Sequence, residues 1–154
     1  MWRAFLDVHR RLELATEQQL AEHGLSPADY ALLVPLSEAP DGVLRVRDLG
    51  LAAAWDRSRL SHQLRRMTTR GLVARFSCQT DARGTMVRLE QAGRRAIEAA
   101  APGHVATVRQ HFVDLLEPDE VDMLAAVFTR LSAQLPVDEA TLCATSTARV
   151  VAKA

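Results

Sequence analysis

The chain has 154 residues, of which 48% are apolar and 25% are charged, and this composition is typical of a single soluble globular domain. Its formal net charge is zero, which by itself argues against a nucleic-acid partner. The charge is unevenly distributed, however: residues 44–88 hold ten arginines and three acidic residues, a local charge of +7, and the remaining residues carry −7. A basic centre that can attract a phosphate backbone is therefore flanked by acidic ends.

Two other classes of protein are disfavoured by the sequence. The longest apolar run, Met123 to Phe128, is far shorter than the roughly 18 residues that cross a bilayer, and no signal peptide begins the chain. We therefore expect a cytoplasmic protein with no membrane partner. Cys78 and Cys143 lack the spacing of a zinc site or a disulfide framework. Cys78 is interpreted as a bystander thiol, with a redox-active thiol near Arg75 or Arg83 as the alternative.

The first part of the chain is predicted to form two helices. Apolar residues at helical spacing indicate a helix over residues 2–22, and Gly24 follows it as a C-terminal glycine cap would. Ser26 and Pro27 are typical of an N-cap followed by proline at the first helical position, which predicts a second helix through Glu38. Pro35 lies inside this second helix and is expected to kink or shorten it.

A helix-turn-helix follows the turn at residues 39–42. Residues 46–53 suit a short third helix, and Asp56 can accept the first unpaired amides of the next one. In that next, arginine-rich helix Leu60, Leu64 and Met67 recur at spacings of four and three, so that one side is apolar. The remaining surface carries Ser58, Arg59, Ser61, His62, Arg65 and Arg66. Such a helix buries one side and offers cations and hydroxyls outward, which is what binding in a DNA major groove requires.

After Gly71 the apolar period changes to that of strands. Residues 72–77 and 85–89 are predicted to form a β-hairpin around the polar loop 78–84. A further helical pattern covers residues 91–116 and is expected to be interrupted or bent near Pro102 and Gly103.

The last helix is predicted to open at residues 117–120, where acidic residues favour the amide end. Its apolar stripe consists of Leu124, Phe128, Leu131 and Leu135. Pro136 ends the helix, and residues 136–154 are aperiodic, which indicates a flexible C-terminal tail.

In this order of elements the chain resembles transcriptional regulators of the MarR (multiple antibiotic resistance regulator) family, over residues 2 to about 135. The motifs that carry the resemblance are Val46-Arg47-Asp48-Leu49 with Leu51-Ala52, Asp56-Arg57-Ser58 through Arg70-Gly71-Leu72-Val73, and Asp81-Ala82-Arg83-Gly84-Thr85 leading to Val87, Leu89, Ala92 and Gly93. Trp55, His62 and Gln63 are typical of one branch of the family, and Glu90 stands where a threonine is frequent.

The resemblance implies a mainly α fold with a small β-hairpin (α+β), namely a winged helix-turn-helix with N- and C-terminal dimerisation helices. Residues 1–135 would form a single winged-helix domain. In it the dimerisation helices, 2–22 and 91–135, flank a DNA-binding lobe at 26–90.

The resemblance also implies which residues contact DNA. Ser58, Arg59, Ser61, His62, Arg65 and Arg66 would face the major groove. Arg83 at the hairpin tip would enter the minor groove, oriented by Asp81, because a carboxylate keeps a guanidinium aimed outward. Arg75 and Arg88 on the strands are candidate phosphate contacts. For each arginine, the alternative is an ordinary solvated surface charge.

A homodimer on a pseudo-palindromic operator is expected, because one recognition helix contacts only a few base pairs and specificity requires two. The apolar surface of the first and last helices could join the two copies; a purely intramolecular core is the alternative. Family members often respond to a small aromatic or anionic ligand. His9, Arg10, Tyr30 and His111 are the candidate lining of such a pocket, with buried, hydrogen-bonded side chains as the alternative for the histidines.

The expected function is that of a sequence-specific double-stranded DNA-binding transcriptional regulator, expected to be a repressor. The rival hypothesis is a winged-helix module that binds another protein without operator binding. An enzyme is not expected, because the five histidines have no nucleophile at catalytic spacing and no phosphate-binding glycine loop occurs. For the same reason no catalytic residue, metal site or cofactor is predicted.

Overall fold

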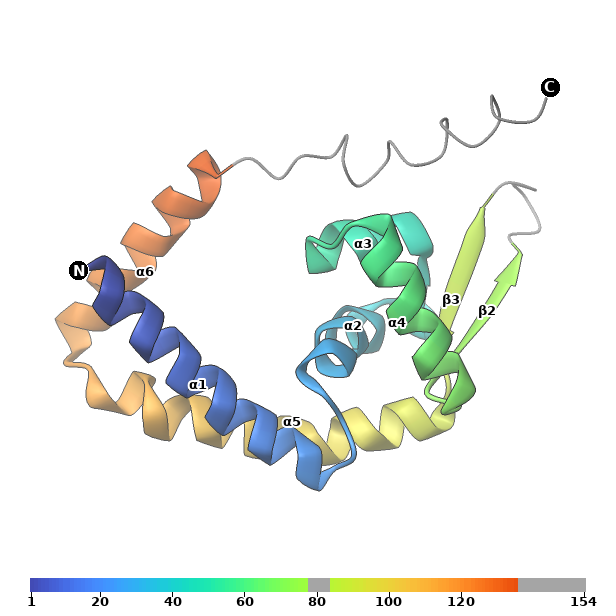
Figure 1. Ribbon diagram of the computed structural model, residues 1–154, viewed down its shortest axis with the longest axis horizontal. Helices are drawn as coiled ribbons and strands as arrows, with labels where there is room; N and C mark the ends of the chain where they lie inside the picture. The colour runs from blue at the N-terminus through green and yellow to red at the C-terminus, as the bar shows by residue number, and fades with distance from the viewer. Residues whose placement is uncertain (78–83, 136–154) are drawn as a thin grey trace. The chain divides into compact units, whose positions relative to one another are not determined.

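The computed structural model describes residues 1–77 and 84–135 (Figure 1). The predictions for Cys78, Asp81 and Arg83, for most of the loop at 78–84 and for the tail at 136–154 lie outside these residues. The described chain forms two compact units. The helical unit consists of residues 1–27 with 98–135, and the winged unit consists of residues 28–97. The assignment of residues 1–135 to one domain stays a prediction.

Helices account for most of the fold. They are α1 (Trp2–Glu22), α2 (Pro27–Glu38), α3 (Val46–Ala53), α4 (Arg57–Thr69), α5 (Gln91–His111) and α6 (Pro118–Gln134), with short 3-10 turns at Pro40–Gly42 and Val113–Leu115. The last helix begins with a capping box, in which the Glu117 and Glu120 side chains each accept from the other residue's backbone N–H. Within residues 1–77 and 84–135 each of these helices lies in a stretch that the sequence predicts as helical. The predicted end of α5 near Leu116 was wrong, because the helix stops at His111 and a 3-10 turn follows it.

Neither internal proline shortens or interrupts its helix, which were parts of the two expectations about proline. Pro35 does not shorten α2. The helix continues to Glu38, the last residue predicted for it. Pro102 does not interrupt α5, which continues to His111. A proline removes one helical donor, but Pro102 lies on an exposed side of the helix, where water can replace that donor.

Two helices end at a glycine in the left-handed conformation, which few other residues adopt. Gly24, with φ of +68°, follows α1, and the N–H of Leu25 donates to the Leu20 carbonyl over 3.0 Å. Gly71, with φ of +70°, follows α4, and there the N–H of Leu72 donates to Met67 over 3.0 Å. Both are Schellman ends, which reverse the chain within two residues. The second one directs the chain from α4 into the sheet.

The sheet has three antiparallel strands in the order β1-β3-β2, namely β1 (Val43–Arg45), β3 (Thr85–Leu89) and β2 (Val73–Ser77). The predicted hairpin is confirmed, with Val73 opposite Leu89 and Ser77 opposite Thr85. β1 was not predicted, because three residues are too few to show an alternating pattern.

The two units differ in how much apolar surface they bury. The winged unit has a core of buried apolar side chains, namely Leu32, Leu33, Leu36, Leu49, Leu60, Leu64, Met67, Val73, Val87 and Leu89. The N-terminus of α5 closes this core: a Cβ on Gly93 would collide with the backbone carbonyl of Leu72 and lie 2.8 Å from Leu89. Only glycine allows so close an approach between α5 and the segment that joins α4 to β2.

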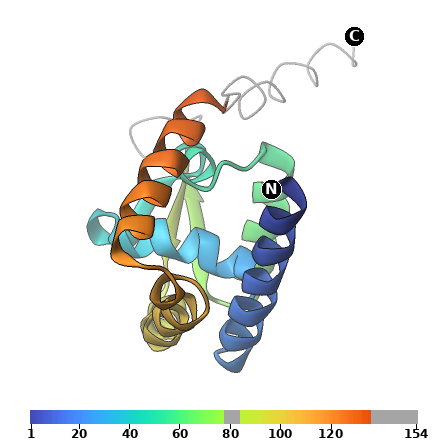
Figure 2. The same ribbon diagram turned by 90° about the vertical axis from the view of Figure 1, so that its left-hand side faces the viewer.

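The helical unit instead leaves many of its large apolar side chains exposed. α6 contains no buried residue, and α1 buries only Leu20. The exposed large apolar side chains of these two helices are Trp2 (66%), Phe5, Leu6, Val8 and Leu14 on α1, Met123, Phe128 and Leu131 on α6, and Leu135 (68%) at the C-cap of α6. Figure 2 shows α1 and α6 as separate arms of this unit. The described part of one chain therefore does not supply the intramolecular core that was the alternative to a dimer.

Candidate nucleic-acid interface

The turn between α3 and α4 fixes where α4 begins. Ala54 adopts a left-handed conformation, with φ of 51°, and the N–H of Trp55 donates to the Gly50 carbonyl over 3.0 Å. Asp56 then caps α4, because its Oδ1 accepts from the backbone N–H groups of Ser58 (2.8 Å) and Arg59 (3.0 Å). The predicted N-cap is confirmed, and the helix-turn-helix is complete.

α4 buries one side and exposes the other. Leu60, Leu64 and Met67 lie in the core, together with Gln63, which is 6% exposed. All six side chains predicted for the major groove are exposed: Ser58, Arg59, Ser61, His62, Arg65 and Arg66. Helical spacing divides them further. Ser58, His62 and Arg65 follow the middle of the exposed side, Ser61 lies on one flank, and Arg59 and Arg66 lie two turns apart on the other. Their exposure is as predicted, and their contact with DNA stays a prediction.

A buried carboxylate on α2 holds α4 from behind. Asp29 is completely buried, and its Oδ1 accepts a hydrogen bond from Gln63 Nε2 over 2.7 Å. Its Oδ2 accepts from Arg70 Nη1, also over 2.7 Å, in an ion pair whose arginine side chain is 39% exposed. The two contacts fix the middle and the C-terminal end of α4 against α2. No local signal in the sequence predicts this network, because Asp29 in the first turn of a helix resembles an ordinary helix-start acid.

Arg59 is held at both ends. Its backbone N–H is bonded to Asp56, and its guanidinium carbon lies 4.1 Å from the centroid of the Trp55 ring. Trp55 itself is only 8% exposed. This distance is that of a cation–π contact, which orients the arginine without neutralising it.

The two strand arginines project to opposite faces of the sheet. Arg75 pairs with Val87, and Arg88 pairs with Ala74; directly paired residues share a face and alternate along the strand. Arg88 donates from Nε and Nη2 to Glu90 Oε1, over 3.2 and 3.1 Å. It therefore carries a compensating carboxylate, whereas Arg75 is exposed on the other face. The sequence placed the two arginines in one class, and the structure separates them.

The predicted effector residues are distributed over both units. In the helical unit, His9 is exposed and lies 3.4 Å from the Glu13 carboxylate, and His111 is exposed at the end of α5. Tyr30 belongs to α2 of the winged unit, where burial raises the pKa of its hydroxyl, so that the phenol stays protonated at neutral pH.

Arg10 is already engaged within α1. Hydrogen bonds from Arg11 and Arg10 lower the pKa of the Asp7 carboxyl, and the Arg10 contact measures 3.3 Å. The pair is exposed at the surface, so it is weak and can exchange with a ligand.

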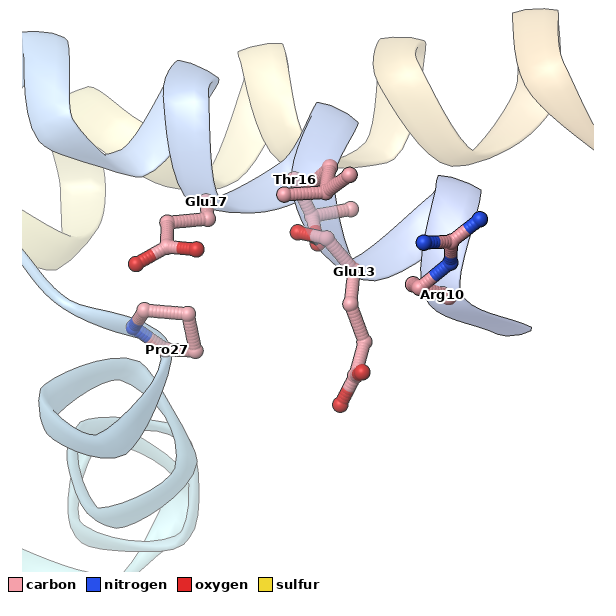
Figure 3. Close-up of a pocket in the computed structure, with 6 residues that line it drawn as sticks. Arg10, Glu13, Thr16, Glu17 and Pro27 are labelled. Carbon is pink, nitrogen blue, oxygen red and sulfur yellow. Dashed lines mark hydrogen bonds between the residues drawn. The ribbon is translucent and has the colours of Figure 1, made fainter. Parts of the chain in front are cut away.

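One shallow depression lies beside Arg10 in the helical unit (Figure 3). It has a volume of about 220 Å³ and is lined by Arg10, Glu13, Leu14, Thr16, Glu17 and Pro27. Typical small-molecule sites enclose roughly 300–1,000 Å³. Glu13 and Glu17 place two carboxylates against one guanidinium, which disfavours an anionic ligand. Of the four predicted effector residues, Arg10 alone lines it.

Over residues 1–77 and 84–135 no three His, Cys, Asp or Glu side chains come together as metal ligands. Within the same residues no helix is both long and apolar enough to cross a membrane.

Comparison with known proteins identifies the family. AbsC, a MarR family transcriptional regulator from Streptomyces coelicolor, is 39% identical to this chain; the match covers 86% of this chain and 89% of AbsC, with a TM-score of 0.82. The chain belongs to the MarR family. It has the winged-helix fold of that family of transcriptional regulators, as the resemblance implied.

Other relatives agree with this assignment to the MarR family. Sco3205, a MarR family regulator from Streptomyces coelicolor whose structure is known in complex with DNA, is 35% identical over 92% of this chain and 89% of its own, with a TM-score of 0.85. The HTH-type transcriptional repressor YetL of Bacillus subtilis is 25% identical over 84% of this chain and 79% of its own. No family model matches the sequence.

The Asp29 network yields a stability prediction. Asp29→Ala should lower the free energy of unfolding by about 1–3 kcal/mol, because Gln63 loses a buried acceptor and Arg70 loses a charged one. Asp29→Asn, which keeps an acceptor for Gln63, should cost less. Urea denaturation measures both variants. Asp48→Ala, which removes an exposed acid from α3, is the control and should change stability by about 0.5 kcal/mol or less. An Asp29→Ala protein as stable as this control would contradict the assigned role.

Proposed function

We propose that this MarR-family protein is a repressor that binds a pseudo-palindromic operator in double-stranded DNA as a homodimer and has no catalytic activity. The observation that carries the proposal is the exposed side of α4, where cations and hydroxyls surround His62 without an apolar residue among them. Its relatives include regulators and a repressor, and Sco3205 has been seen on DNA.

The proposed contacts divide between base edges and phosphates. The N-terminal half of a recognition helix meets base edges, which assigns base contacts to Ser58, Arg59, Ser61 and His62. Arg65 and Arg66, further along α4, would contact bases or phosphates, and Arg75 would contact phosphate. Arg88 is the weaker candidate, because Glu90 would have to release it. From the sequence alone, we assign Arg83 to the minor groove with Asp81 as its orienting partner.

In the proposed homodimer, the second copy would cover the apolar side chains that the helical unit exposes. Phe128 and Leu131 on α6, with Trp2 and Phe5 on α1, are each more than 40% exposed in one chain. Monomeric proteins rarely leave large apolar side chains gathered in water in this way, so a second copy is the partner that we propose for both helices. A two-fold axis through these helices would present two α4 helices to successive major grooves, roughly 34 Å apart.

The proposed regulator also responds to a small-molecule effector. The two carboxylates that line the depression beside Arg10 disfavour an anionic ligand, so a neutral aromatic compound is the ligand that we propose. A thermal-shift screen with neutral and anionic phenols should give a rise in the melting temperature for some neutral compound, because binding to the folded state stabilises it. If no compound of either kind shifts the transition, effector control is refuted for this ligand class.

Salt dependence separates DNA binding from the rival function, a protein-binding module. Phosphate contacts release counterions, so the affinity for an operator selected from a random pool should fall by on the order of a thousandfold between 50 and 200 mM salt. Fluorescence anisotropy with a labelled duplex measures this slope. Weak binding with a flat salt response on every duplex would favour the protein-binding module.

A charge placed in the apolar stripe of α6 should disrupt the dimer. Phe128→Glu should weaken dimerisation on the order of a hundredfold, because the interface would have to bury a carboxylate. The matched control is Ala126→Glu, which adds the same charge to the side of α6 away from the stripe. Sedimentation equilibrium gives both association constants. Equal effects of the two substitutions would argue against this interface.

A further inference from the structure

Arg59 differs from the other fixed arginines of the winged unit in what holds it. Arg70 is paired with the carboxylate of Asp29 and Arg88 with that of Glu90, so an acid offsets each charge. The guanidinium of Arg88 also lies 5.7 Å from the centroid of the Phe76 ring, in addition to its carboxylate partner. The guanidinium of Arg59 lies closer to a ring, 4.1 Å from the Trp55 centroid. Within residues 1–77 and 84–135, no carboxylate forms an ion pair with Arg59.

Stacking leaves the recognition chemistry of a guanidinium intact. The aromatic ring covers one face of the plane, while the N–H donors point along its edges and remain available. Asp56 fixes the backbone of the same residue through its N–H, so both the root and the tip of the side chain are restrained. Trp55 and Asp56, the two residues that precede α4, together determine where this fork of donors lies.

We propose that Trp55 is a positioning residue that pre-orients Arg59 for a bidentate contact with a pair of acceptors on DNA. The acceptors would be the edge of a guanine or two phosphate oxygens. This inference rests on the proposed function. A flexible arginine loses rotamer freedom when it binds, and pre-orientation removes part of that cost. The expected gain in operator affinity is about two- to tenfold.

A double-mutant cycle on the full chain tests the proposal. Operator affinity is measured by anisotropy for the wild type, Trp55→Leu, Arg59→Ala and the double variant, with circular dichroism to confirm that each is folded. Trp55→Leu should lose about two- to tenfold in affinity in the wild-type background and almost nothing when Arg59 is already alanine.

Arg66 provides the matched control, because it lies on the same flank of α4, two turns further on, and has no cation–π partner among the described residues. Trp55→Leu and Arg66→Ala should have additive effects. Trp55→Phe keeps an aromatic face, so it should retain most of the operator affinity that Trp55→Leu loses. It also serves as the test variant if Trp55→Leu does not fold.

The outcomes separate the two levels of the proposal. Additive effects at Trp55 and Arg59, with wild-type protein that binds its operator, would overturn the positioning role alone. Wild-type protein that binds no duplex at low salt would overturn the proposed function and this role with it. A second selection with Arg59→Ala distinguishes the acceptors: preference lost at one base pair indicates a guanine edge, and uniform weakening on all sequences indicates phosphate.

Discussion

The buried carboxylate of Asp29 is the contact on which the position of α4 depends. It is completely buried and accepts from Gln63 and Arg70, each over 2.7 Å. A charge in that position is costly unless its partners stay in place, so α2 and α4 must keep their register. The apolar side chains of α4 pack in the core and would tolerate small shifts of the helix. The hydrogen bonds from Gln63 and Arg70 to Asp29 would not tolerate them. The opposite side of α4 is thereby presented in one orientation.

The arginines of the winged unit differ in whether a carboxylate offsets their charge. Those that fix structure, Arg70 and Arg88, are matched with carboxylates. Arg59 is held by an uncharged ring and keeps its full attraction for an anion. A neutral chain can therefore present a basic surface, because its acids are concentrated elsewhere or are used to hold particular arginines. The net charge alone would have argued against a DNA partner.

Local sequence signals predicted most of the fold because the signals themselves are local. The Asp56 cap, the glycines after α1 and α4, and the apolar spacing of Leu60, Leu64 and Met67 all act within a few residues. The family resemblance then supplied the arrangement of the elements. β1 was not predicted because three residues are too few to show the alternation of a strand. The interruption predicted at Pro102 does not occur, because an exposed proline can be accommodated in a helix.

The candidate site could be predicted only as far as its exposed side chains. The face of α4 follows from helical spacing, but the contacts that orient it join residues distant in the sequence, such as Asp29 with Arg70. No periodicity reveals them. The separation of Arg75 from Arg88 likewise depends on strand register, which a one-residue change would reverse. The groove assignment of Arg83 rests on sequence alone.

Hydroxyl-radical footprinting of the wild-type protein on a selected duplex tests the central claim most directly, namely that two copies of this fixed α4 surface grip DNA together. Two protected clusters are expected on the same side of the duplex, about one helical turn apart. A single cluster, or uniform cleavage along the whole duplex at low salt, would contradict it.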